Sequence, residues 1–293
     1  IGDVLIIFYK YLLNHIQLYV FIIIMINFQK SVLIVSHPDD ECIFASSILD
    51  KVSALIICFN KIPGEINLSQ SRNEAISNYP FNKIKLINLN ITQAKKSLLP
   101  INWLNIRDCK SGIKGGYQPK FYNKNYKILL KKLIEYIPKN SEIITHNPWG
   151  EYGHAEHCQV FKACFEISLL TNSKLFVSGY VSNLSNSYAK KKIYLLSKEF
   201  YTYKTNKDIY YVLYNHYLKY RCWTWYHNYS IPSKESFLRV DLKQNPNLYK
   251  KSLLIQFPLN MIKHINPFLF YLKGILRPFI PLIFKRIYRL IKR

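Results

Sequence analysis

Two short segments combine imidazole and carboxylate side chains at spacings that suit a metal site. The first, residues 36–41, reads Ser-His-Pro-Asp-Asp-Glu, and the second, residues 149–157, reads Trp-Gly-Glu-Tyr-Gly-His-Ala-Glu-His. Imidazole nitrogen and carboxylate oxygen are suitable ligands for zinc, and a catalytic zinc ion takes about three protein ligands and keeps one position open for water. His37, Asp40 and His157 supply two imidazoles and one carboxylate, so they are the predicted metal ligands.

The other polar residues of these segments suit the remaining steps of a metal-assisted hydrolysis. Asp39 is the predicted general base, because a carboxylate that does not bind the metal is free to accept a proton from water. His154 lies three residues before His157 and shares its face if a helix starts there, so it is predicted to donate a proton or to stabilise charge. Tyr152 is predicted to donate a hydrogen bond to a developing oxyanion.

Two further carboxylates are expected just behind the ligands. Glu156 is predicted to orient His154, and Glu41 closes the first motif. Taken singly, residues 36–41 would also fit an ordinary turn, and residues 154–157 would also fit an ordinary helix start. The metal-site interpretation is favoured because the two motifs occur together and each follows an apolar strand.

Apolar runs of strand length alternate with helical patterns from residue 31 onward. The predicted strands are 31–35, 54–59, 84–89, 142–145 and 175–177, and the predicted helices between them are 69–78, 124–136 and 157–170. This alternation predicts an α/β fold with a doubly wound, Rossmann-like, mostly parallel sheet. In such sheets ligands bind at the carboxyl ends of the strands, where both motifs would lie.

At these residues the sequence resembles the PIG-L/LmbE-like family of zinc-dependent N-deacetylases. That family carries a His-Pro-Asp-Asp-Glu motif after its first strand and a Gly-His-x-x-His motif later, which here occupy residues 37–41 and 153–157. The resemblance covers about residues 31–180. It implies an LmbE-like fold and a zinc ion on the three predicted ligands. Another divalent metal such as Fe2+ is the alternative, because the order of metal affinities alone does not fix selectivity.

The resemblance also implies roles for four further residues. Asp39 would be the general base, and His154 and Tyr152 would take part in catalysis. Arg72, which belongs to an Arg-x-Glu sequence, would reach a sugar hydroxyl or phosphate of the substrate. The short Asp-Gly loop that many relatives carry before the second motif is not identified in this sequence, and residues 107–109 stand near its expected place.

The motifs and the resemblance together imply a hydrolase acting on linear amide C–N bonds. The expected reaction removes the N-acetyl group from an N-acetylglucosamine-type sugar or glycoconjugate, whether free, lipid-linked or nucleotide-linked, and releases acetate. Hydrolysis of another N-acyl or thiol conjugate is the alternative within this chemistry. A noncatalytic basic protein that binds membrane or nucleic acid is the alternative from another class, and salt-dependent binding without turnover would identify it.

The chain is strongly basic, with 41 Lys and Arg against 17 Asp and Glu and a net charge of +24, which favours anionic partners. In the predicted C-terminal tail, residues 242–293, apolar residues lie beside Lys and Arg. This pattern predicts peripheral contact with an anionic membrane, with a terminal helix packed on the core as the alternative. A nucleic-acid partner is not expected, because no recognised nucleic-acid motif accompanies the charge.

Two other parts precede this tail. The apolar segment 1–28 is interpreted as a membrane anchor, a signal peptide or a stretch outside the mature protein, and the last is favoured. Residues 29–241 form the expected LmbE-like domain, and the aromatic rings of its residues 181–241 are expected to pack in a helical layer. The six cysteines form no CxxC pair, which favours a cytoplasmic protein, free or on the cytoplasmic face of a membrane.

Overall fold

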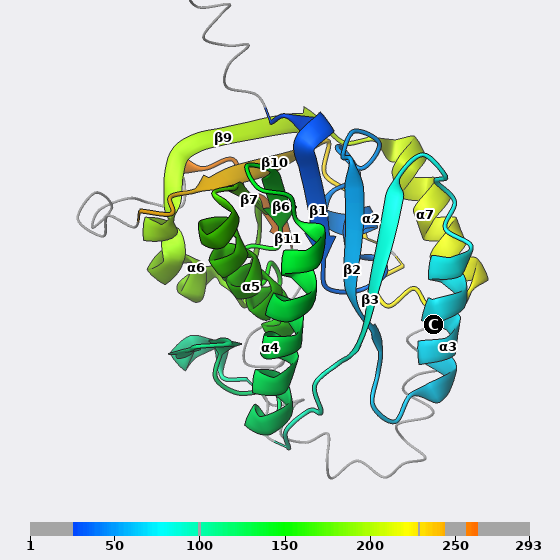
Figure 1. Ribbon diagram of the computed structural model, residues 1–293, viewed down its shortest axis with the longest axis horizontal. Helices are drawn as coiled ribbons and strands as arrows, with labels where there is room; N and C mark the ends of the chain where they lie inside the picture. Colours follow the sequence, from blue (N-terminus) through cyan, green and yellow to red (C-terminus); the bar gives the residue numbers. More distant parts are fainter. Residues whose placement is uncertain (1–25, 99–100, 228, 244–255, 263–293) are drawn as a thin grey trace, which may run out of the picture.

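The computed structural model describes residues 26–98, 101–227, 229–243 and 256–262. In these residues seven strands form one central sheet (Figure 1). In spatial order the strands are β3 (Lys85–Thr92), β2 (Ala54–Lys61), β1 (Ser31–Val35), β6 (Glu142–Thr145), β7 (Lys174–Ser178), β10 (Lys234–Val240) and β9 (Leu196–Lys204). The first five are parallel, and β10 and β9 add antiparallel pairs at one edge. The expected α/β fold with a mostly parallel sheet is confirmed.

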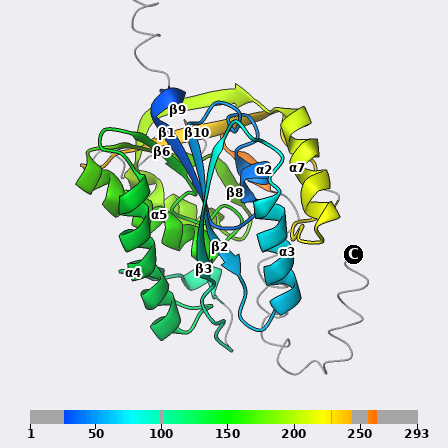
Figure 2. The same cartoon turned by 45° about the vertical axis from the view of Figure 1, so that its right-hand side comes forward.

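Helices cover both faces of this sheet (Figure 1, Figure 2). One face carries α2 (Asp40–Phe44), α3 (Ile66–Ser77) and α7 (Lys207–Lys219), and the other carries α4 (Pro119–Tyr136), α5 (Ala155–Thr171) and α6 (Asn186–Lys192). The short elements are η1 (Phe28–Lys30), η2 (Trp103–Asn105), η3 (Ile193–Leu195), β4 (Asp108–Cys109), β5 (Gly112–Ile113), β8 (Tyr180–Ser182) and β11 (Asn260–Ile262). The strands β4 and β5 form a small antiparallel pair, and β8 pairs in parallel with β11.

The apolar run of β1 explains why both faces are covered. All five of its residues are buried, and successive side chains of a strand point to opposite faces. Val32 and Ile34 pack in the core layer with α4 and α5, whereas Leu33 and Val35 pack in the layer with α2, α3 and α7. A strand that is apolar on both faces is stable only between two layers, so β1 lies in the middle of the sheet.

The strands and helices predicted between residues 31 and 177 all occur. The strands 31–35 and 142–145 have the predicted bounds, and the other elements have shifted ends. The helical layer predicted for residues 181–241 is only partly right. Helix α7 is present and buries Tyr210 and Tyr217, but β9 and β10 are strands that extend the sheet. In β9 half-buried and exposed residues alternate with the period of a strand. Tyr201 and Tyr203 lie on the half-buried face and Lys198 and Lys204 on the exposed face, but the exposed face also carries Phe200, which weakens this period in the sequence.

The described part of the predicted tail, residues 256–262, packs on the domain. Phe257 is buried in the core layer of α4 and α5, and β11 adds to β8. The apolar segment up to residue 25 and the basic stretch after residue 262 lie outside the described residues. Among the helices of the described ranges, none is long and apolar enough to cross a membrane. All six cysteines lie in described ranges and are free thiols.

Candidate metal centre and active site

The two motifs meet where the strand order reverses. Strands β1 and β6 are parallel neighbours, but the chain continues from β1 to β2 on one side and from β6 to β7 on the other. Ligands of doubly wound sheets bind at the carboxyl ends of the strands beside such a reversal. Residues 36–40 follow β1 and residues 146–157 follow β6, so both predicted motifs lie at this edge.

Three candidate ligand atoms converge there. Asp40 Oδ2 lies 3.2 Å from His37 Nδ1 and 3.3 Å from His157 Nε2. The far nitrogen of His37, Nε2, lies 2.9 Å from Glu156 Oε2. The far nitrogen of His157, Nδ1, lies 2.7 Å from Glu151 Oε2. A carboxylate that accepts the far N–H fixes the tautomer and leaves the near lone pair for a metal. Accordingly, His157 Nε2 has no hydrogen-bond partner among the described residues.

The surroundings of these atoms are acidic although the chain is basic. Five of its 17 acidic residues are buried here, namely Asp39, Asp40, Glu41, Glu151 and Glu156. Although burial opposes ionisation, His157 and His37 hold the pKa of Asp40 well below its usual range and keep this carboxylate charged. Buried negative charge is unfavourable unless a cation compensates it. Nitrogen donors beside the charged carboxylates of Asp40 and Glu151 therefore fit a divalent metal ion such as zinc.

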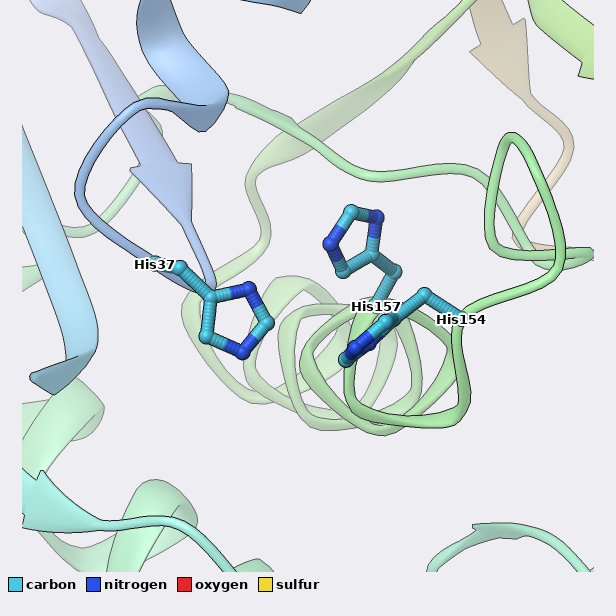
Figure 3. A group of neighbouring side chains, drawn as sticks. All are labelled: His37, His154 and His157. Atoms are coloured by element: carbon cyan, nitrogen blue, oxygen red, sulfur yellow. The ribbon is translucent and has the colours of Figure 1, made fainter. Parts of the chain in front are cut away.

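His154 completes a group of three imidazoles. Figure 3 shows His37 on the loop after β1, and His154 and His157 at the start of α5. The ring centroid of His154 lies 4.9 Å from that of His37 and 4.7 Å from that of His157. Removal from water and the two neighbouring rings hold the pKa of His154 well below its usual value, so the imidazole is neutral at pH 7. A neutral imidazole still carries one N–H that is able to donate a hydrogen bond.

Sequence reasoning misses His146, which lies beside these ligands. Its Nε2 is 3.3 Å from Asp40 Oδ2 and accepts the backbone N–H of Ser36 at 2.8 Å. Its Nδ1 is 3.2 Å from Glu151 Oε2. His146 also stacks on His157, with ring centroids 3.8 Å apart, and together with Asp40 and His157 it forms a group that is close enough to hold a metal ion. The available signal in the sequence is its place directly after β6.

Asp39 stands beside the ligands with contacts of its own. Its Oδ2 accepts hydrogen bonds from the backbone N–H of Thr224 at 2.9 Å and from Thr224 Oγ1 at 2.6 Å. Burial and the charge of Asp40 raise the pKa of Asp39 to about 6, against the opposing effects of Arg72 and Thr224. Asp39 therefore exchanges protons near neutral pH, which suits a general base.

Tyr152 lies between the site histidines and an aromatic group. Its ring centroid is 5.6 Å from that of His154, 5.3 Å from that of His157 and 4.6 Å from that of Trp225. Burial, followed by the charge of Asp40, raises the pKa of the Tyr152 hydroxyl well above its usual range. The hydroxyl therefore stays protonated and is able to donate a hydrogen bond.

Glu156 makes a different contact from the predicted one. Its Oε2 faces His37 rather than His154, and its Oε1 accepts the backbone N–H of Ala94 at 3.1 Å. The reason is its place in the first turn of α5, where successive side chains point in different directions. Glu156 therefore faces the loop after β1 and orients a predicted ligand.

Glu41 and Arg72 lie on the side of the site covered by α3. Glu41 Oε1 accepts hydrogen bonds from the hydroxyls of Tyr79 and Tyr217, and burial raises the pKa of Glu41 to about 8. It therefore supports the α3 and α7 layer. Arg72 is buried, and its Nε and Nη1 make no hydrogen bond to any residue in the described ranges. Its charge acts on Asp39, so these donors lie near the candidate base.

Glu151 is a supporting carboxylate that sequence reasoning misses. Its Oε1 accepts the backbone N–H of Asn147 at 2.9 Å and the hydroxyl of Ser178, while its Oε2 faces His157. Although burial opposes ionisation, His146 and His157 lower the pKa of Glu151 to about 2. This residue is thus a fixed, charged acceptor for the far N–H of a predicted ligand.

Replacing Glu151 with Gln is expected to lower metal affinity about 10- to 100-fold, because the neutral amide holds the His157 tautomer less firmly. Competition of the metal-free protein against a chromophoric chelator measures this change. Glu135→Gln, at an exposed position of α4, is the control and should leave the affinity unchanged. Equal affinities for Glu151→Gln and the parent would contradict the assigned role.

Comparisons with known proteins give low similarities. No family model matches the chain. An uncharacterised protein of Acanthamoeba polyphaga mimivirus, L374, is 26% identical over 186 residues, which are 60% of this chain and 72% of that protein. Among solved structures, a zinc-inhibited form of the teicoplanin deacetylase Orf2 gives a TM-score of 0.47 at 10% identity, covering 72% of this chain and 98% of that one. The pseudoaglycone deacetylase Dbv21 gives a TM-score of 0.44 at 10% identity, covering 73% and 98%. The activity of this chain is therefore inferred from its own site residues.

Proposed function

We propose that this protein is a metal-dependent amide hydrolase that removes the N-acetyl group from an N-acetylglucosamine-type sugar or glycoconjugate. One observation carries the proposal. His37 Nδ1 and His157 Nε2 lie 3.2 and 3.3 Å from Asp40 Oδ2, and Asp39 stands beside them with its Oδ2 bonded to Thr224. His157 also belongs to both groups of side chains that are close enough to hold a metal ion, one with His37 and His154 and one with Asp40 and His146. Three ligands with a separate carboxylate form the arrangement that metal-assisted hydrolysis needs.

The reaction requires polarisation of the amide carbonyl, removal of a proton from water, protonation of the leaving amine and stabilisation of the oxyanion. When bound at His37, Asp40 and His157, a divalent ion supplies Lewis-acid polarisation of the amide carbonyl and acidifies water. Asp39 takes a proton from the attacking water as the new C–O bond forms. The proton then passes to the amine nitrogen as the C–N bond breaks, which yields acetate and a free amine.

The charge that develops on the carbonyl oxygen needs hydrogen-bond donors that are already in place. The protonated hydroxyl of Tyr152 and the N–H of neutral His154 are the two nearby donors. The unpartnered Nε and Nη1 of Arg72 are assigned to a hydroxyl or phosphate of the substrate. The half-buried ring of Trp225, beside Tyr152, offers an apolar face to a sugar ring.

A substrate panel tests the proposal. Metal-loaded protein is incubated with N-acetylglucosamine in free, nucleotide-linked and lipid-linked form, and with an N-acyl thiol conjugate. We expect acetate and free amine in equal amounts from at least one acetylated sugar. Cleavage of the thiol conjugate alone would show that the substrate is another amide and not an acetylated sugar. Absence of cleavage throughout the panel, with metal bound, would contradict the proposed activity.

Replacing Tyr152 with Phe is expected to lower kcat by about 10²- to 10³-fold without abolishing turnover, because one of two oxyanion donors is lost. The phenyl ring retains the packing against Trp225, so the fold should not change. Steady-state acetate release measures the effect, and Tyr211→Phe, at a side chain that is 53% exposed on α7, is the matched control. A Tyr152→Phe rate equal to that of the parent would remove Tyr152 from the mechanism.

A further inference from the structure

The segment that follows α7 reaches the site from a distant part of the chain. Thr224 is 185 residues away from Asp39 in sequence, and both of its donors, the backbone N–H and Oγ1, bond to the same oxygen, Asp39 Oδ2. Thr224 also lies beyond residues 31–180, the span in which the sequence resembles a known family. Its place at the site is thus a feature that the motifs do not contain.

These two hydrogen bonds distinguish the oxygens of Asp39. Oδ2 accepts both bonds from Thr224, whereas Oδ1 accepts no hydrogen bond from the residues that the structure describes. Two donors on one oxygen fix the rotation of the carboxylate about the Cβ–Cγ bond. Oδ1 is therefore left as the oxygen that takes a proton, and a base transfers protons efficiently only within hydrogen-bond reach and in a defined direction.

The backbone conformation of Asp39 shows why its side chain needs the two hydrogen bonds from Thr224, which together act as a clamp on the carboxylate. Asp39 has a φ of 96°, in the left-handed region that residues with a side chain rarely adopt. A residue in that region is strained and persists only where its surroundings hold it in place. The two bonds from Thr224 fix the far end of this side chain, since the backbone alone does not favour its conformation.

The segment that carries Thr224 is itself anchored on both sides. Before it, the backbone N–H groups of Cys222 and Trp223 both donate to the carbonyl of Tyr217, at 3.0 and 3.2 Å, and close the end of α7. After it, the ring of Trp225 packs 4.6 Å from that of Tyr152. A donor held at both ends is able to impose a direction on the carboxylate that it binds.

We propose that Thr224 is the positioning residue for Asp39, and that its hydroxyl sets the orientation in which Oδ1 accepts the proton of the attacking water. The inference rests on the proposed function for its kinetic consequence but not for its structural one. Thr224 acts through Asp39 and touches none of the three predicted ligands in the described contacts. Its loss should change the rate of the chemical step and leave metal affinity and KM unchanged.

Thr224→Val removes the hydroxyl and keeps the branched shape and the backbone N–H, whereas Thr224→Ser keeps the hydroxyl. The position is exposed, so neither change leaves a cavity. We expect kcat to fall about 10- to 100-fold in Thr224→Val with KM unchanged, and to return to within about threefold of the parent in Thr224→Ser. Thr202→Val is the matched control, because Thr202 is also exposed and also bonds through its hydroxyl, to Ser236 at 3.0 Å on a distant edge of the sheet.

Crystal structures of Thr224→Val and Thr224→Ser give a second measurement that needs no turnover. We expect the Asp39 carboxylate to be rotated in the Val variant and unchanged in the Ser variant. An unchanged carboxylate in Thr224→Val, or a fall in kcat that Ser does not reverse, would overturn the inference. If the parent releases no acetate, the proposed function fails, but the orientation of Asp39 in the two variants still decides the role of Thr224.

Discussion

Asp39→Asn is expected to lower kcat by about 10²- to 10⁴-fold while the protein still binds one metal ion. Asn has the size of Asp and still offers an oxygen to the donors of Thr224, so the loop and the clamp should persist. The amide does not accept a proton from water, and the step assigned to the base is lost. Acetate release at saturating substrate and metal analysis of the same sample measure both parts of the prediction.

Asp50→Asn is the control for this substitution, because Asp50 is exposed and belongs to the same chain segment. Full activity is expected in the control. Unchanged turnover in Asp39→Asn would contradict the assignment of the base. Loss of metal together with activity would instead place Asp39 among the ligands, which the hydrogen bonds of its Oδ2 to Thr224 argue against.

His157→Ala is expected to lower metal affinity by more than about 100-fold, because a ligand should matter more than the carboxylates behind it. Activity should fall with the metal content and should not return when metal is added at the parent's saturating concentration. His157 Nε2 is buried and has no hydrogen-bond partner in the described part of the chain, so the substitution removes a nitrogen that is available to a metal.

His227→Ala tests whether histidines in general contribute to this binding, because His227 is exposed and follows the site segment after α7. Its metal affinity should equal that of the parent. Isothermal titration of the metal-free proteins gives affinity and stoichiometry together. Parent-like affinity in His157→Ala would mean that His157 is not a ligand of the metal.

The sequence was informative where the candidate site residues directly follow a buried strand. Residues 36–40 and 154–157 could be placed at one edge of a sheet because strands that are apolar on both faces lie in the middle of parallel sheets. The contacts around Asp40 agree with that placement. His146 could have been found by the same reasoning, since it follows β6 directly.

Other residues reach the site through geometry that no local pattern encodes. Glu151 turns toward His157 because Gly150 and Glu151 both adopt positive φ angles, 68° and 47°. A Cβ on residue 150 would lie 2.4 Å from the carbonyl oxygen of His154, so only glycine fits there. Thr224 depends on where the end of α7 comes to lie, which follows from packing across the whole layer. The order of β9 and β10 is likewise decided by tertiary pairing.

His37, Asp40 and His157 are proposed to hold one metal ion that amide hydrolysis requires. The most direct test is to add Zn2+ stepwise to metal-free protein and to measure acetate release from the best acetylated sugar of the panel at each step. We expect no release without metal and a rise in proportion to metal up to one equivalent per chain, with release by Asp39→Asn about 10²- to 10⁴-fold slower at every step. Release that does not depend on added or removed metal would mean that these three residues hold no metal ion that the reaction requires.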